Sequence, residues 1–184
     1  MKEIVTKILS RDEVKKIDFT AAGIKVSPLG FNAVKSHVES ERIKVKYSRK
    51  MPRNTAKYVY THNRMLLSFR RLEGSQDREA LIVHECVHAI ADIAGKKLLV
   101  AHSEAAAYVA QCLYFYYRNQ KDIDAGTLEV EFAHDILKEG WDIAARARKN
   151  NTLTEADLEP LLKAIGTDPL YRRRHEKYDE YDGV

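Results

Sequence analysis

The chain of 184 residues has only two cysteines, Cys86 and Cys112. Two thiols cannot form the disulfide framework of a small secreted domain, so we expect them to be free and buried in a reducing compartment. Long apolar runs are also missing, because charges interrupt residues 1–9 and no stretch reaches the length of a membrane span. These absences predict a cytoplasmic protein without a signal peptide or a membrane partner, while export by a route that needs no signal peptide stays open.

Internal repeats, low-complexity stretches and a strong excess of one charge are absent as well. The 31 Lys and Arg residues against 27 Asp and Glu residues leave a net charge of +4. A balance this close to neutral predicts no specific nucleic-acid partner. The 45% of hydrophobic and 32% of charged residues are typical of one globular domain at this length. We assign this domain to residues 1–170 and interpret residues 171–184 as a charged, flexible tail.

The period of the hydrophobic residues changes twice along the chain. Helical spacing predicts helices within residues 1–40, one of which begins at the capping box of Ser10 and Glu13 and ends at Gly23. Alternation then predicts strands in residues 43–69, and helical spacing returns after them. We therefore expect an α+β fold with N-terminal helices, a small antiparallel sheet of about three strands, and a helical core. The predicted elements are helices 28–40, 77–94, 102–120 and 127–149, a short helix capped by Thr154, and strands 43–47, 58–60 and 65–69.

The feature that carries chemistry is the HExxH motif His84-Glu85-Cys86-Val87-His88, inside a predicted helix. Residues four apart share one face of a helix, so both imidazoles can reach one zinc ion at about 2.0–2.1 Å. Glu85 lies about 100° round the helix, where its carboxylate can accept a proton from water without ligating the metal. The alternative is two core histidines that bond backbone carbonyls, but a buried His-Glu-His cluster without a cation is costly.

A catalytic zinc site usually has three protein ligands and leaves its fourth position to water. Glu104 is the candidate for the third ligand, because it lies sixteen residues after His88 in the first turn of the next predicted helix. The alanines at 105–107 would allow that helix to approach the motif helix closely. His102 is the rival ligand. The alternative interpretation of Glu104 is an ordinary first-turn glutamate that the helix dipole stabilises.

Residues 81–110 resemble the core of the zincin metallopeptidases, in the gluzincin arrangement in which a glutamate on the next helix follows HExxH. The resemblance implies that a peptide or protein is the substrate and that Glu85 is the general base. It also implies that the small sheet precedes the motif helix and that residues 65–69 form the edge strand along which an extended substrate binds. The Zn²⁺ ligands that it implies are His84, His88 and Glu104.

Two departures limit this resemblance. Tyr108 stands where thermolysin-like enzymes have an aspartate, four residues after the third ligand, and no third histidine follows the motif closely. Neither a subfamily nor a substrate specificity is assigned for this reason. Tyr108 is itself a catalytic candidate, because either Tyr108 or His102 could donate a hydrogen bond to the developing oxyanion. A core tyrosine and a histidine near a helix N-cap are the alternative interpretations.

Asp92 is the candidate for a residue that orients a ligand. It lies one turn after His88 on the same face of the predicted helix and could accept the imidazole N–H. The alternative is a surface aspartate near the helix C-terminus, where a carboxylate opposes the helix dipole. We therefore predict that Asp92 holds His88 from behind.

Two other classes of protein stay open. Glu85-x-x-His88 and Glu131-x-x-His134, with Glu104 between them, resemble the ligand order of a di-iron carboxylate bundle. The predicted strands count against a bundle, and so does the charged helix face that Glu131 and His134 would share. The other class is a zinc-stabilised module that binds a partner without hydrolysis, because the motif indicates metal capacity rather than turnover. The sequence gives no indication of an oligomeric state.

Overall fold

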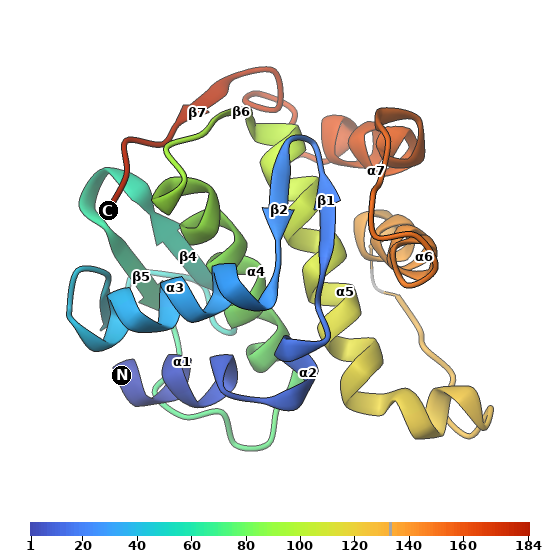
Figure 1. Cartoon of the computed structure of the whole chain (residues 1–184), viewed down its shortest axis with the longest axis horizontal. Helices are drawn as coiled ribbons and strands as arrows, with labels where there is room; N and C mark the ends of the chain where they lie inside the picture. The colour runs from blue at the N-terminus through green and yellow to red at the C-terminus, as the bar shows by residue number, and fades with distance from the viewer. Residues whose placement is uncertain (133) are drawn as a thin grey trace.

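The structure is a computed structural model and describes residues 1–132 and 134–184. Its helices are α1 (Lys2–Leu9), α2 (Asp12–Lys15), α3 (Pro28–Glu39), α4 (Gln76–Ile93), α5 (Val100–Asp124), α6 (Asp135–Ala147) and α7 (Glu155–Thr167). Its strands are β1 (Phe19–Ala21), β2 (Ile24–Val26), β3 (Lys44–Tyr47), β4 (Ala56–Val59), β5 (Arg64–Leu67), β6 (Lys97–Leu99) and β7 (Tyr178–Glu180). The two longest helices, α4 and α5, pack against each other through the centre (Figure 1). The α+β class is confirmed.

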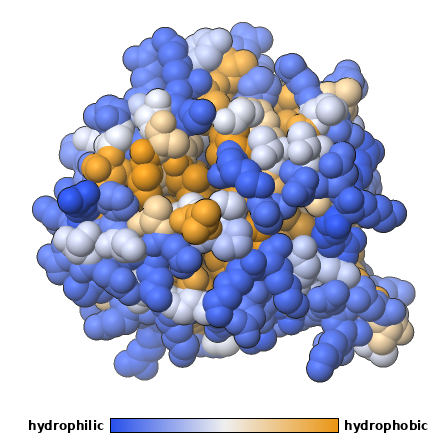
Figure 2. Space-filling model, viewed as in Figure 1, coloured by the Kyte–Doolittle hydropathy of each residue, from blue (hydrophilic) through white to orange (hydrophobic). Residues whose placement is uncertain are grey.

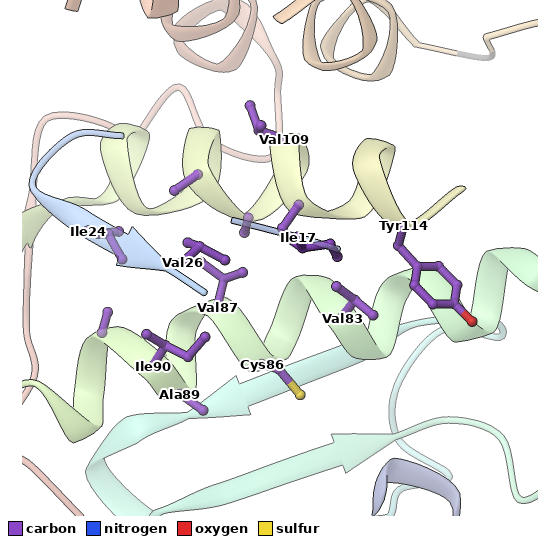
Figure 3. Close-up of a cluster of buried hydrophobic side chains, with 14 of the residues drawn as sticks. Ile17, Ile24, Val26, Val83, Cys86, Val87, Ala89, Ile90, Val109 and Tyr114 are labelled. Atoms are coloured by element: carbon purple, nitrogen blue, oxygen red, sulfur yellow. The ribbon is translucent and has the colours of Figure 1, made fainter. Parts of the chain in front are cut away.

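Helix α4 lies in the middle of the hydrophobic core. It begins after Ser75, whose hydroxyl accepts a backbone N–H of the first turn, and Gly95 follows its end with a φ of 56°. Val83 and Val87 are fully buried and point toward α5, whereas Cys86 points toward the strands on the other side (Figure 3). Because apolar residues occur around most of its circumference, α4 is covered on opposite sides by α5 and by the sheet.

Small residues on α5 let the two central helices approach. Ala105, Ala106 and Ala107 are fully buried in the first half of α5. Alanine adds little bulk between helix axes, so the start of α5 can lie close to the HExxH turn of α4. This is the close approach that the three alanines predicted.

The central sheet has the strand order β3-β5-β4. β4 and β5, which correspond to the strands predicted at 58–60 and 65–69, form an antiparallel hairpin in which Asn63 adopts the left-handed conformation with a φ of 45°. β3 differs from the prediction because it runs parallel to β5, which makes the sheet mixed rather than antiparallel. The chain passes from β3 to the opposite edge before it returns to the centre. Residues 65–69 therefore supply the central strand, and β4 is the edge strand that packs beside α4.

The first forty residues are less helical than predicted. α3 is confirmed with its N-cap Ser27, but the helix that follows Ser10 ends at Lys15. The strands β1 and β2 come next and pair antiparallel around Ala22 and Gly23, which have φ values of 49° and 78°. Two successive left-handed residues suit a tight hairpin turn. Strand β2 of this hairpin lies against α4 and α5 (Figure 3).

Helix α6 begins later in the chain than predicted. α6 begins at Asp135, whereas the hydrophobic pattern predicted a helix from residue 127. Residues 128–132 form no helix, and Ala133, within the predicted helix, lies outside the described residues. α7 has the predicted cap, since Thr154 and Asp157 form a complete capping box.

Residues 171–184 pack onto the domain, which differs from the predicted flexible tail. β7 pairs antiparallel with β6, the short strand between α4 and α5. Tyr171 and Tyr181 are each only 6% exposed. In Figure 1 this red segment runs across the end of the molecule beside β6. The C-terminal segment therefore belongs to the folded unit.

The surface carries few large apolar side chains. On the face drawn in Figure 2 most atoms are hydrophilic, and apolar side chains gather mainly over the region of α3 and α4. Leu29 on α3 is 80% exposed. Among the described residues, we find no helix that combines the length and the apolar character needed to cross a bilayer.

Candidate metal centre

Helices α4 and α5 bring three possible ligand atoms together. His84 and His88 lie one turn apart on α4, and Glu104 lies near the start of α5. All three side chains are buried, and one ligand atom from each lies within 4.8 Å of the other two. In the described part of the chain no other group of three His, Cys, Asp or Glu residues meets this condition. The structure thus brings together the three predicted ligands.

The separations of these atoms fit a tetrahedral zinc ion. Ligand atoms at about 2.0–2.1 Å from zinc lie about 3.3–3.4 Å from one another. His84 Nε2 lies 3.2 Å from Glu104 Oε2 and 3.4 Å from His88 Nε2. The third separation, between His88 Nε2 and Glu104 Oε2, is 3.8 Å. Each edge is therefore within about 0.5 Å of the length that zinc requires.

The second nitrogen of each imidazole has a polar partner. Gln111 Oε1 lies 3.0 Å from His84 Nδ1, and Ser103 Oγ lies 2.8 Å from His88 Nδ1. An amide oxygen only accepts, which assigns the proton of His84 to Nδ1 and leaves the Nε2 lone pair for a metal. The Ser103 hydroxyl is also 2.8 Å from the Tyr181 hydroxyl, to which it can donate while it accepts from His88. These contacts fix the orientation of both rings.

The charges in the cluster favour a cation. Burial acts to raise the pKa of the Glu104 carboxyl, but His88, His84 and Arg174 outweigh it and hold that pKa at about 2. Burial acts to lower the pKa of His84, but the hydrogen bond to Glu104 and the charge of Glu85 outweigh it, so the pKa is raised. Two imidazole lone pairs and a carboxylate that face one another repel unless a positive charge lies among them. A proton or a metal ion can supply that charge.

Glu85 lies beside the ligands and not among them. Its side chain is on the face of α4 that packs against β4, where Oε2 accepts the Tyr58 backbone N–H at 2.5 Å. It is 7% exposed and lines the same cleft as the three ligands. This is the relation to the metal site that the HExxH motif predicted for a base.

A cleft of about 590 Å³ lies over the ligand atoms. One wall is the edge strand β4 together with Met51 and Thr55 of the preceding loop. The C-terminal segment forms another wall, with Tyr171, Arg174 and Tyr181. Its volume is in the range of pockets that hold a small molecule or a few residues of a peptide.

Asp92 does not hold His88, which corrects our prediction. Its side chain is fully buried, and Oδ2 accepts the Tyr58 hydroxyl at 2.6 Å. Its other oxygen accepts the Gly183 backbone N–H at 3.2 Å. Asp92 therefore joins β4 and the C-terminal segment to α4, and Ser103 has the position behind His88.

Neither Tyr108 nor His102, the two residues that we expected as oxyanion donors, lines the cleft over the ligands. The Tyr108 ring packs edge-on against His84 with centroids 4.6 Å apart, and its hydroxyl is 3.0 Å from that of Tyr171. Of these two tyrosines, Tyr171 lines the cleft. His102 points away from the cluster, with Nε2 3.7 Å from Glu155 at the start of α7.

Sequence reasoning missed the residues that the C-terminal segment contributes. Arg174 Nη2 lies 3.2 Å from Glu104 Oε1, the oxygen that does not face the histidines. Tyr181 lies 3.3 Å from His88 Nδ1. No spacing rule connects these positions with the motif, which they approach only through tertiary contact. Gln111 did carry a signal, because it lies two helical turns after Glu104 on the same helix face.

The second E-x-x-H pair does not join the cluster. Glu131 and His134 are exposed in the connection before α6, and Ala133 between them lies outside the described residues. A di-iron bundle needs carboxylates and histidines from both pairs around two metals. The described residues offer one buried group, which suits a single ion.

A comparison of the chain with protein-family models, curated proteins and solved structures found no match. The resemblance of residues 81–110 to zincins remains an expectation, supported here by the arrangement of the ligands alone.

Proposed function

We propose that this protein is a zinc-dependent metallopeptidase. The observation that supports the proposal best is the group of His84, His88 and Glu104 at one side of a cleft whose wall is the edge of a sheet. Structural zinc sites are closed by four protein ligands, whereas catalytic sites keep one position open. Three ligands beside a cleft, within the described residues, have the character of a catalytic site.

Each residue of the centre then has a role. The two histidines and Glu104 would hold Zn²⁺, which when bound lowers the pKa of water and polarises a carbonyl as a Lewis acid. Glu85 takes the proton of the attacking water and passes it to the leaving amine. Its position suits this role, because its side chain is buried and lines the cleft. The Tyr58 N–H holds one of its oxygens, so the other can accept the proton.

The edge strand β4 is placed to bind a substrate in extended form. Backbone groups of an edge strand alternate between its partner strand and its free side. The Tyr58 N–H points to Glu85 and thus to the free side, so the backbone groups of Ala56 point to that side too. The Tyr58 N–H is bonded to Glu85, so a peptide that pairs with the backbone groups of Ala56 would carry its scissile bond past Glu85.

Two tyrosines are placed to support the reaction. Tyr171 lines the cleft, and we assign to it the donor role toward the developing oxyanion that we first expected of Tyr108. The Tyr108 hydroxyl, 3.0 Å away, orients it. Burial raises the pKa of Tyr108 to about 12 and also raises the pKa of Tyr171, so both hydroxyls keep their protons at neutral pH.

Glu85→Gln tests this proposal. The amide can still accept a hydrogen bond but cannot take a proton, so we expect unchanged zinc content and folding with hydrolysis of denatured casein reduced at least about 100-fold. Glu155→Gln, which changes an exposed carboxylate on α7, is the matched control and should keep both the zinc and the hydrolysis. Loss of metal from Glu85→Gln would make Glu85 a ligand and favour a di-iron site. A wild-type protein that holds zinc but cuts no peptide would be the binding module instead.

A further inference from the structure

The small net charge of the whole chain conceals a strong segregation. Residues 42–72 contain ten Lys or Arg and no Asp or Glu. Because the chain has 31 basic and 27 acidic residues, the remainder has 21 basic and 27 acidic residues and a net charge of −6. The ten basic residues are Arg42, Lys44, Lys46, Arg49, Lys50, Arg53, Lys57, Arg64, Arg70 and Arg71.

This segment forms the whole central sheet and its loops. Lys44 pairs with Arg64, and Lys46 and Lys57 lie on either side of Leu66. Side chains alternate across a strand, so these four cations share the face of the sheet opposite to the one that Met65 and Leu67 bury. We name this face and its adjoining loop of residues 48–54 the basic sheet surface. Like charges side by side on a sheet are destabilising, so folding alone gives no reason for them.

The cations of the segment form no ion pairs in the described part of the chain. None of the ten makes an ion pair within 4.0 Å, although many other surface Lys and Arg residues do. Nine of the ten are exposed, and only Arg64 is partly buried. Arg70 instead stacks on the Tyr47 ring at 4.4 Å. The positive charge is therefore available to a partner from outside.

The basic sheet surface is continuous with the cleft. Lys57 belongs to both, because it lies on the outward face of the edge strand β4 and lines the cleft. Met51 and Pro52 line the cleft, and Arg49, Lys50 and Arg53 flank them in the same loop. A chain that lies along β4 and leaves the cleft past this loop would meet its cations.

We propose that the basic sheet surface binds an acidic segment of the polypeptide that the cleft cuts. The inference rests on the proposed function, since it takes the occupant to be the substrate. Acidic side chains at alternate positions of an extended chain repeat about every 6.6–6.8 Å on one side, which suits a row of lysines on a strand. Single-stranded nucleic acid is the weaker candidate, because no outward position of the three strands carries an aromatic side chain for base stacking.

Fluorescence anisotropy tests the proposal without turnover. The protein is the zinc-loaded Glu85→Gln variant, and the probe is a labelled peptide of about twelve residues with Glu at alternate positions. The reference is the same peptide with Gln in place of Glu. We expect the acidic peptide to bind at least about tenfold more tightly at low salt and to lose this advantage as the salt concentration rises. Equal affinity for both peptides would overturn the proposal.

A charge-reversal variant locates the interaction. Lys44→Glu, Lys46→Glu and Lys50→Glu, all at exposed positions, should together weaken binding of the acidic peptide at least about tenfold. The matched control makes the same change in net charge elsewhere and should leave binding within about twofold. Its substitutions are Lys121→Glu, Lys149→Glu and Lys163→Glu, also at exposed positions. Equal losses in both variants would reduce the effect to net charge and refute a defined surface.

Three further outcomes separate this inference from the proposed function and from nucleic-acid binding. If the wild-type protein cuts neutral peptides and acidic peptides equally well, the metallopeptidase stands and the acidic preference is wrong. If an oligonucleotide of equal charge binds more tightly than the acidic peptide and the charge-reversal variant abolishes that binding, the surface belongs to a nucleic acid. Binding of the acidic peptide without any hydrolysis by the wild-type protein would support the surface and refute the peptidase.

Discussion

The pH dependence of the metal-free protein should reveal the buried carboxylate of the centre. Glu104 has an ordinary pKa of 4.5, and in the folded protein the pKa is held at about 2. A folded pKa below the unfolded one means that the native state holds its proton more weakly. The contribution to stability is therefore complete above about pH 4.5 and disappears as the pH falls toward 2. The gap corresponds to about 3 kcal/mol.

The contribution of His84 to stability has the opposite dependence on pH. Its pKa is raised in the metal-free protein, so its contribution is complete below the ordinary value of 6.5 and is lost as the pH rises through the folded value. The metal-free centre should therefore stabilise the fold most between about pH 4.5 and 6.5. Zinc replaces the proton above that range, so the difference in melting temperature with and without chelator should grow from about pH 5 to pH 8.

Urea unfolding of the wild-type protein and of Glu104→Gln, both treated with chelator, measures the carboxylate contribution. The amide does not titrate, so the difference in unfolding free energy between the two proteins should shrink by about 3 kcal/mol from pH 5 to the acid limit. A difference that stays constant over this range would show that Glu104 is not the group described. An equal effect of chelator at pH 5 and pH 8 would show that imidazoles are not the ligands.

Four substitutions test the centre and the contacts around it. Glu104→Ala should lower zinc affinity by more than the about 10–100-fold loss that is typical when a residue behind a ligand is removed, while His102→Ala should leave the affinity unchanged. Equilibrium titration against a metal indicator measures both affinities. A loss of zinc affinity in His102→Ala alone would make His102, and not Glu104, the third ligand. Ser103→Ala should itself lower affinity about 10–100-fold, and an unchanged value would mean that its bond to the ligand imidazole is dispensable. Tyr58→Phe should reduce the unfolding free energy by about 1–3 kcal/mol in urea melts, because it removes a hydroxyl donor from the buried carboxylate of Asp92. An unchanged unfolding free energy would show that this hydrogen bond does not stabilise the fold.

The elements that the sequence predicted well are those with local signals. Ser27 and Pro28 mark the start of α3, and the apolar period together with Gly95 marks α4. The β1–β2 hairpin was missed because the capping box at Ser10 was extended to Gly23. The pair Ala22-Gly23 between short apolar runs was the available turn signal. The parallel pairing of β3 with β5 has no local signal, because alternation specifies a face and not a partner.

The residues of the site also divide into those with a local sequence signal and those that only tertiary contacts bring together. His84, His88 and Glu85 follow from helical geometry alone, and Glu104 from one short link between two helices. The role of Asp92 could not be predicted in this way, because its partners come from β4 and from the C-terminal segment. The charge of the central sheet was visible in the sequence, but a total over the whole chain concealed it.

The C-terminal wall of the cleft has a consequence for how the protein reaches its native state. The Gly183 N–H and Asp92 are 91 positions apart, and Tyr181 and His88 are 93 positions apart. Contacts this distant close slowly, whereas neighbouring helices such as α4 and α5 can form and pair early. We therefore expect the ligands to meet before this wall docks, while the centre is still open to metal ions. Zinc captured at that stage would be enclosed by the last segment to fold, so the order of folding sets the order of assembly.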